Sequence, residues 1–222
     1  MQSISGRLGG AIAGLVFVVG LVVLVFIAPA PPAIDDSSGE FLDYLSDKRT
    51  HLMVQSSLMM LLWIPLVLFA PWLWRYVHER EASDRYMGLI AATSLVAGWA
   101  LFTVVQMSFG GLAYVADQTL AADEARNLTV IFSVLWKAVI AALAITAVAS
   151  GIVFVAQRSG LRWVGWFGIA VAVVIAAAQF TWSKEEGILA PDAGGFLPFL
   201  LVMVYLLVVA IAMTRAARRP AA

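Results

Sequence analysis

The chain has 222 residues, of which 62% are hydrophobic and 13% are charged, with a mean hydropathy of +0.92. A water-soluble fold cannot hide that much apolar surface, so the composition excludes an ordinary soluble domain. The 14 basic residues balance the 14 acidic ones, which argues against a nucleic-acid-binding protein. The absence of cysteine excludes disulfides, thiolate metal sites and cysteine nucleophiles.

Six long apolar runs predict membrane-spanning helices, because about 20 helical residues cross the ~30 Å hydrocarbon core. Their approximate bounds are Leu8–Ala28, Leu52–Trp74, Met87–Phe109, Leu128–Ala156, Trp163–Trp182 and Phe196–Thr214. The runs are continuous rather than alternating, which favours helices over a barrel. The sequence therefore predicts an all-α, polytopic transmembrane bundle that forms one domain over residues 1–222.

The first run could be taken for a signal peptide, because Ala28-Pro29-Ala30 resembles a cleavage site. The run is longer than a signal-peptide core of roughly 7–15 residues, and Pro31 would follow the cut. We expect it to be retained as the first span.

The placement of positive charge predicts the orientation of the spans, because Lys and Arg resist translocation. With the amino terminus inside, nine of these residues are cytoplasmic: Arg7, Arg75, Arg80, Arg85, Arg158, Arg162, Arg215, Arg218 and Arg219. Four lie outside, namely Lys48, Arg49, Arg126 and Lys184, and Lys137 falls within a span. Lysine is scarce beside arginine, and alanine and valine are abundant, as in many GC-rich bacterial genomes. We therefore expect six spans in a bacterial inner membrane, with both termini cytoplasmic.

The outer segment 37–51 carries a helix start signal, since Ser37-Ser38-Gly39-Glu40 has the form of a capping box. Apolar residues then recur at helical spacing, which predicts an amphipathic helix that continues into the second span. Pro65 is expected to kink that span.

Two later connections also have predicted structure. In the outer loop 110–127, Asp123 is expected to be the N-cap of the fourth span. The inner loop from Gln157 to Arg162 is so short that the fourth and fifth spans should form a tight antiparallel hairpin.

Lys137 is the one charged residue well inside an apolar run, and an intramembrane charge is a functional-site hypothesis by default. It lies 20 residues before Gln157, close to the outer boundary of the membrane, where a lysine side chain can snorkel. A structural pair with an outer carboxylate such as Asp117 and a role in a substrate or proton path are the alternatives.

Three glutamines, Gln55, Gln106 and Gln179, lie in or near spans. With nearby Ser and Thr residues they could line a polar path, or they could make ordinary interhelical hydrogen bonds, which we favour.

The first span carries glycines at Gly6, Gly10 and Gly14, the spacing that lets membrane helices approach closely. The partner is either a neighbouring helix of the same bundle or a second copy of the chain.

Metal and haem sites are not indicated. His51 and His78 fall at opposite ends of the second span, which excludes ligation by both. The outer acidic residues Asp35, Asp36, Glu40, Asp43 and Asp47 could attract a cation or a basic partner, but a solvated outer face also explains them.

Three boundary motifs resemble those of an uncharacterised family of bacterial six-span membrane proteins of unknown function. They are Phe41-Leu42-x-Tyr44 followed by Arg49, Asp123-Glu124-Ala125-Arg126-Asn127, and Leu161-Arg162-Trp163-Val164-Gly165-Trp166. The resemblance implies a six-span fold and transfers no catalytic residue.

No phosphate loop, serine elbow or zinc helix is present in the sequence. We therefore expect an integral membrane protein without a catalytic site or cofactor, acting as an accessory, sensor or partner-binding component. Its expected partners are the lipid bilayer and either another protein or a second copy of the chain. The alternative is a transporter or channel for ions or small molecules that uses Lys137 and the glutamine positions.

Overall fold

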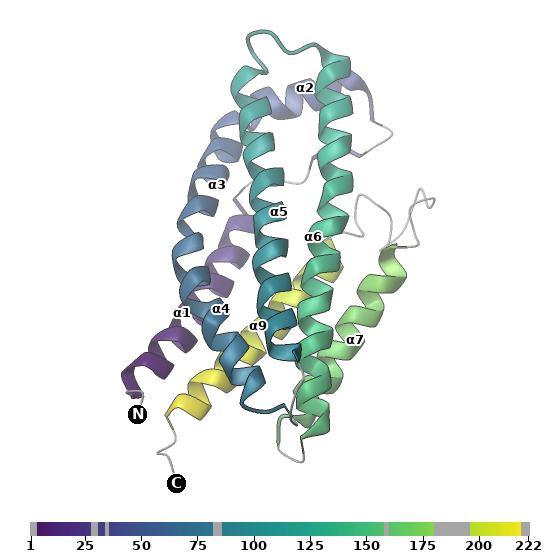
Figure 1. The fold of residues 1–222 in the computed structure, drawn as a ribbon. Helices are drawn as coiled ribbons and strands as arrows, with labels where there is room; N and C mark the ends of the chain where they lie inside the picture. The colour runs from purple at the N-terminus through teal and green to yellow at the C-terminus, as the bar shows by residue number, and fades with distance from the viewer. Residues whose placement is uncertain are drawn as a thin grey trace.

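A computed structural model describes residues 4–27, 31–33, 36–81, 86–157, 160–179 and 196–218. Within these ranges the chain is all-helical, as predicted (Figure 1). The helices are α1 (Ile4–Val25), α2 (Ser38–Asp47), α3 (Arg49–Leu61), α4 (Trp63–His78), α5 (Met87–Val115), α6 (Ala122–Ala156), α7 (Arg162–Gln179) and α9 (Phe196–Ala217).

Five of these helices are long and apolar enough to cross a membrane, namely α1, α5, α6, α7 and α9. A sixth is obtained if α3 and α4 are counted as one broken span. Large apolar side chains lie on the outside of every one of them, for example Val16, Val67, Val104, Ile145, Val173 and Val204. A helix that is apolar both inside and outside is typical of a membrane span, so the fold is that of a multi-pass helical bundle.

The spanning helices form a closed circuit. Helix α1 packs on α4, α4 on α5, α5 on α6, α6 on α7, α7 on α9, and α9 returns to α1. Helix α3 packs along α5, and α2 lies across the ends of α5 and α6 (Figure 1). Helix α1 begins and α9 ends at the opposite end of the bundle from α2 (Figure 1). We call these the terminal end and the α2 end.

The predicted kink in the second span is confirmed and lies at Leu62. Helices α3 and α4 meet there at an angle of 42°. Pro65 has no N–H for the carbonyl of Leu61, and its ring crowds that carbonyl, which favours a bend in the preceding turn. The Leu62 N–H instead bonds to the Met59 carbonyl at 3.2 Å, and Gly20 of α1 leaves room for the Leu62 side chain.

The predicted hairpin between the fourth and fifth spans is also confirmed. Helices α6 and α7 are joined by a short connection and pack along their lengths. A Cβ atom at Gly165 would lie 2.6 Å from the Gly151 carbonyl oxygen, and one at Gly151 would lie 2.9 Å from that of Gly165. Two glycines facing each other therefore permit this close approach.

The segment 37–51 forms the expected amphipathic helix, but it does not run unbroken into the second span. The Ser37 N–H donates to the Glu40 carboxylate at 3.3 Å, which satisfies one backbone donor at the start of α2. Phe41 and Leu45 are fully buried. The helix ends at Lys48, which separates α2 from α3, so α2 can lie across the bundle instead of along it (Figure 1).

The predicted cap at Asp123 is wrong by two positions. Helix α6 begins at Ala122 after an N-cap at Ala121, whose N–H donates to the Glu124 carboxylate at 3.4 Å. The Asp123 carboxylate accepts the Ser38 hydroxyl of α2 at 2.7 Å. Its side chain joins two helices instead of capping its own.

Several helix bounds differ from the predicted spans. Helix α5 runs on to Val115 and α6 starts six residues before Leu128, because a helix can extend beyond the hydrocarbon into water. The predicted span ends at Ala28 and Trp182 lie outside the described residues.

Candidate functional site

Two of the candidate intramembrane residues, Lys137 and Gln179, lie together. The Gln179 side-chain amide donates to the Lys137 backbone carbonyl at 3.4 Å, joining α7 to α6. Lys137 lies 19 residues before the end of α6 at Ala156, or about 28 Å at ~1.5 Å per residue. That distance is close to the thickness of the hydrocarbon core, and the position of Lys137 at a membrane boundary stays a prediction.

Asp117 does not join this pair. Its carboxylate lies 3.0 Å from the Arg49 guanidinium, in a bridge between the start of α3 and the turn that follows α5. The suggested partnership of Asp117 with Lys137 is therefore corrected to one with Arg49.

The other two glutamines lie at helix contacts on the α3 side of the bundle. The buried Gln55 amide donates to the Leu24 carbonyl at 2.8 Å, which ties α3 to the end of α1. At Gln106 it is the backbone carbonyl that is used, since it accepts the Ser56 hydroxyl at 2.7 Å. These hydrogen bonds place the predicted polar residues at separate helix interfaces, as ordinary interhelical hydrogen bonding would.

The glycine pattern of the first span faces α4 of the same chain. A Cβ atom at Gly10 would lie 1.8 Å from the Trp72 ring, and one at Gly14 would lie 2.6 Å from the Phe69 ring. The missing side chain of each glycine therefore leaves space for an aromatic ring from α4. The neighbouring helix, one of the two partners expected for this pattern, therefore contacts Gly10 and Gly14, and the surroundings of Gly6 lie outside the described residues.

The centre of the bundle is filled by aromatic rings. Trp99 of α5 meets Phe17 edge-on at 4.8 Å between ring centroids and lies 5.4 Å from Phe102. Phe102 in turn packs on Trp136 and Phe199 from α6 and α9. The gap beside these rings has an apolar lining and is too narrow to admit a water molecule.

A chain of hydroxyl groups crosses the bundle from α5 to α9. The Ser94 and Thr146 hydroxyls are 2.9 Å apart, and the Ser150 hydroxyl donates to the Thr146 carbonyl at 2.6 Å. Ser150 also contacts the buried Tyr205 hydroxyl at 2.7 Å. These bonds satisfy polar groups that would be costly in a membrane interior.

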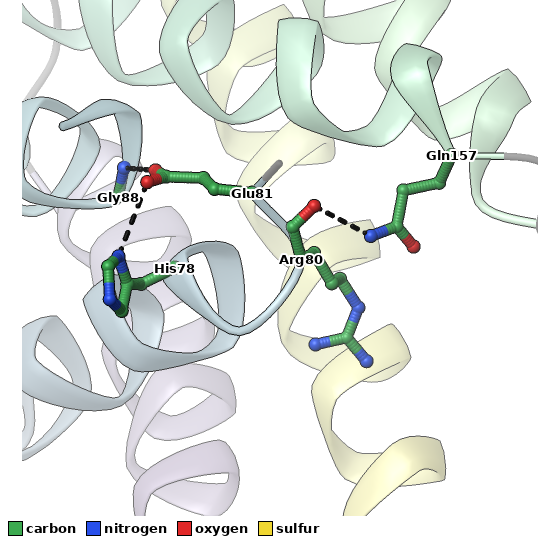
Figure 2. A network of polar contacts seen from close by, with 5 residues as sticks. All are labelled: His78, Arg80, Glu81, Gly88 and Gln157. Carbon is green, nitrogen blue, oxygen red and sulfur yellow. Dashed lines mark hydrogen bonds and ion pairs between the residues drawn. The ribbon is translucent and has the colours of Figure 1, made fainter. Parts of the chain in front are cut away.

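The terminal end carries a polar network between α4, α5 and α6 (Figure 2). The Glu81 side chain is only 2% exposed and lies 3.2 Å from His78 Nδ1. It also accepts the backbone N–H of Gly88, in the first turn of α5. A carboxylate there satisfies a free backbone donor and lies at the positive end of the helix dipole.

The loop that carries Glu81 is also fastened to α6. The Gln157 side chain donates to the Arg80 carbonyl at 2.9 Å. Figure 2 shows the Arg80 side chain pointing away from Glu81 and Gly88. Its guanidinium lies 3.6 Å from the centre of the Tyr76 ring and donates to the Tyr76 carbonyl at 2.7 Å.

At the α2 end, α2 presents an acidic stripe to the outside. Glu40, Asp43 and Asp47 are exposed and lie within one face of the helix, while Phe41 and Leu45 are buried on the other. Among the described residues, no cluster of His, Cys, Asp or Glu is arranged to hold a metal ion.

Comparisons of the chain with protein-family models, with curated proteins and with solved structures find no match.

Three of the residues that organise these contacts were missed in the sequence: Glu81, Gln157 and Tyr205. Glu81 stands in a charged run before the third span, where an acidic residue near a helix start is a weak capping signal. Tyr205 is a hydroxyl in an otherwise apolar run, and buried tyrosines usually find a hydrogen-bond partner. Gln157 gave no signal beyond its place at a span end.

Proposed function

We propose that this protein is a non-catalytic component of a bacterial inner membrane that binds a partner protein through α2 and the helix ends beneath it. In this proposal it has six spans and both termini in the cytoplasm, so that α2 faces the outside. The observation that carries the proposal is an amphipathic helix fixed across the bundle with its acidic side left exposed. An accessory or sensor role is consistent with such a surface.

The fixation of α2 supports a recognition role because an ordered surface loses little entropy on binding. Phe41 and Leu45 are buried beneath the helix. Ser38 bonds to Asp123 of α6 at 2.7 Å, and Arg49 bonds to Asp117 at 3.0 Å, so both ends of the segment are tied down.

The charge of the stripe indicates the chemistry of the partner. Glu40, Asp43 and Asp47 are three exposed carboxylates on one helix face. Such a stripe attracts a basic surface and orients it during encounter. We therefore propose that the partner carries a basic patch and lies at the outer face of the inner membrane.

Arginine placement supports the orientation. The arginines of the terminal end include Arg75, Arg80, Arg162, Arg215 and Arg218. The α2 end carries the basic residues Lys48, Arg49 and Arg126. The excess at the terminal end favours the cytoplasm for that side.

The orientation is tested by labelling single cysteines, which need no background removal because the chain contains no cysteine. We expect an impermeant maleimide to label D43C in intact spheroplasts and to label G160C only after lysis. Both positions are exposed, and a Cβ atom at Gly160 meets no neighbour within 4 Å. Labelling of G160C in intact spheroplasts would show that the chain has the opposite orientation and would contradict the proposed topology.

The partner proposal is tested by quantitative co-purification from crosslinked membranes. The variant E40K/D43K/D47K should reduce recovery of any protein enriched with the wild type by about tenfold, and E40Q/D43N/D47N should reduce it less, because repulsion is added only in the first. Equal recovery with all three chains, or a wild type that enriches no protein, would count against the proposal.

Transport is the alternative function, and the broken second span is the observation that favours it. Discontinuous spans form substrate sites in many transporters, and α3 and α4 meet at 42° beside Pro65. Uptake or efflux of a solute that depends on the chain, abolished by restoring a continuous helix with P65A, would favour transport over partner binding.

A further inference from the structure

Arginine side chains in this protein are repeatedly held against aromatic rings. Three such pairs are present among the described residues: Arg49 over Tyr114, Arg75 over Trp72 and Arg80 over Tyr76. The distances from guanidinium carbon to ring centre are 5.4 Å, 5.5 Å and 3.6 Å in that order. Arg80 therefore makes the closest stack of the three.

The three arginines differ in how their charge is balanced. Arg49 bonds to Asp117 at 3.0 Å, and Arg75 bonds to Glu79 at 2.6 Å. Within the described ranges, Arg80 has no carboxylate within salt-bridge distance. Its positive charge is thus held in place without a countercharge from those residues.

The guanidinium of Arg80 is also fixed in orientation. One of its nitrogens, Nη1, donates to the Tyr76 carbonyl at 2.7 Å, and its face covers the buried Tyr76 ring. The Gln157 amide holds the Arg80 carbonyl at 2.9 Å, so the backbone is fastened as well. A guanidinium has five N–H donors in a rigid fork, and the described residues accept from Nη1 and leave several of the other donors for a planar or tetrahedral oxyanion.

The position of Arg80 selects the source of that oxyanion. It follows the last turn of α4, at the same end as the exposed aromatic residues Tyr86, Trp163 and Trp166. Exposed tryptophan and tyrosine at span ends mark the level of lipid headgroups. The exposed residues Arg162, Arg215 and Arg218 of the same end add to the positive potential there.

We propose that Arg80, stacked on Tyr76, binds the phosphate of an anionic phospholipid headgroup. The phosphate would accept hydrogen bonds from the free guanidinium nitrogens and supply the countercharge that Asp117 and Glu79 supply to the other two arginines. This proposal depends on the chain lying in a membrane and is independent of any protein partner at the α2 end.

The experiment compares retained lipid by native mass spectrometry. Full-length protein is equilibrated in detergent with equal amounts of phosphatidylglycerol and phosphatidylcholine, and the ratio of the two bound lipids is measured. The wild type should prefer phosphatidylglycerol, and R80Q should lower the ratio about fivefold, the effect expected for one basic residue at a membrane surface. An unchanged ratio in R80Q would overturn the proposal.

Matched controls are R75Q and R49Q, which remove arginines that stack on rings but already have carboxylate partners. Both should keep the wild-type ratio within about twofold, because each removes the same charge as R80Q but a guanidinium that already bonds to a carboxylate. A loss in R75Q as large as that in R80Q would show a general surface charge effect and would overturn the assignment to Arg80.

Two further variants keep the test decisive. R80K retains the charge without the planar guanidinium and should give a ratio between those of the wild type and R80Q. This variant keeps the proposal testable if R80Q does not fold. Asp84 lies outside the described residues, and D84N should leave the ratio unchanged. A rise in D84N would mean that a carboxylate already occupies Arg80.

A competition arm distinguishes lipid from free phosphate. Glycerol 3-phosphate at millimolar concentration should not displace phosphatidylglycerol from the wild type, because the acyl chains add apolar binding energy. Complete displacement would replace the lipid assignment with a soluble phosphate site.

Discussion

The Glu81 carboxylate accepts the backbone N–H of Gly88, seven residues later in the chain, and thereby caps the amino terminus of α5. The same side chain contacts His78 at the end of α4. One buried carboxylate thus fixes the junction between the second and third spans (Figure 2).

This relationship predicts that E81Q destabilises the bundle. The amide lacks the negative charge that favours the helix start, and we expect a loss of about 1–2 kcal/mol in the free energy of unfolding. Thermal unfolding in detergent, followed by tryptophan fluorescence, measures it. The control is E79Q, whose carboxylate is 43% exposed and makes an i,i+4 pair, worth below about 0.5 kcal/mol. Equal effects of E79Q and E81Q would contradict the capping role.

The packing of α1 on α4 predicts different results for substitutions at two adjacent glycines. G10A places a Cβ atom 1.8 Å from the Trp72 ring, whereas a Cβ atom at Gly9 meets no neighbour within 4 Å. We expect G10A to lower the free energy of unfolding by about 1–3 kcal/mol through overpacking. G9A should be neutral or slightly stabilising, and a neutral G10A would show that the ring moves aside freely.

The docking of α2 is predicted to depend on apolar burial more than on the ion pair. Leu45 is fully buried, so L45A should cost about 2–5 kcal/mol of docking free energy. D117N removes a partly exposed bridge to Arg49 and should cost below about 1 kcal/mol.

Limited trypsin cleavage after Lys48 and Arg49 reports whether α2 remains docked. L45A should accelerate this cleavage strongly, and D117N should change it little. The docking model fails if D117N is cleaved as fast as L45A.

The Tyr44 side chain predicts a loss of α2 docking at alkaline pH. Burial raises the pKa of the Tyr44 phenol above its ordinary value of about 10, because the charged phenolate is poorly solvated there. The folded state thus favours the protonated ring, and the contribution to stability is complete below pH ~10 and lost as the pH rises through the folded pKa.

The measurement is the mobility of a spin label at D43C, on the exposed face of α2. Mobility should rise above pH ~10 in the wild-type background and stay nearly constant when Y44F removes the ionisable group. A rise of the same size in Y44F would assign the transition to other groups.

The hydroxyl pair in the bundle predicts a small effect. Tyr205 and Ser150 lie 2.7 Å apart and are buried, yet hydrogen bonds between membrane helices average about 0.6 kcal/mol. Y205F should therefore lower the free energy of unfolding by about that amount, measured by thermal unfolding with S150A as the reciprocal variant. A loss of several kcal/mol would indicate that the pair belongs to a larger network.

Much of this fold could be predicted from the sequence, because the features involved are local. An apolar run of span length forms a helix wherever it lies. Pro65 bends a helix at the preceding turn, and the short connection from Gln157 to Arg162 forces a hairpin. Helix α2 could be predicted from Ser37, Glu40 and the spacing of its apolar residues.

The pairings between helices could not be predicted in the same way. Helices that are apolar on all sides give no periodic signal of which face turns inward, so their order and rotation follow only from packing. That packing placed Gly10 against Trp72, gave Asp117 to Arg49 instead of Lys137, and left Arg80 stacked on Tyr76. The sequence by itself determined the helices and their lengths, and the tertiary structure alone decided which side chains meet, because such contacts join residues far apart in the chain.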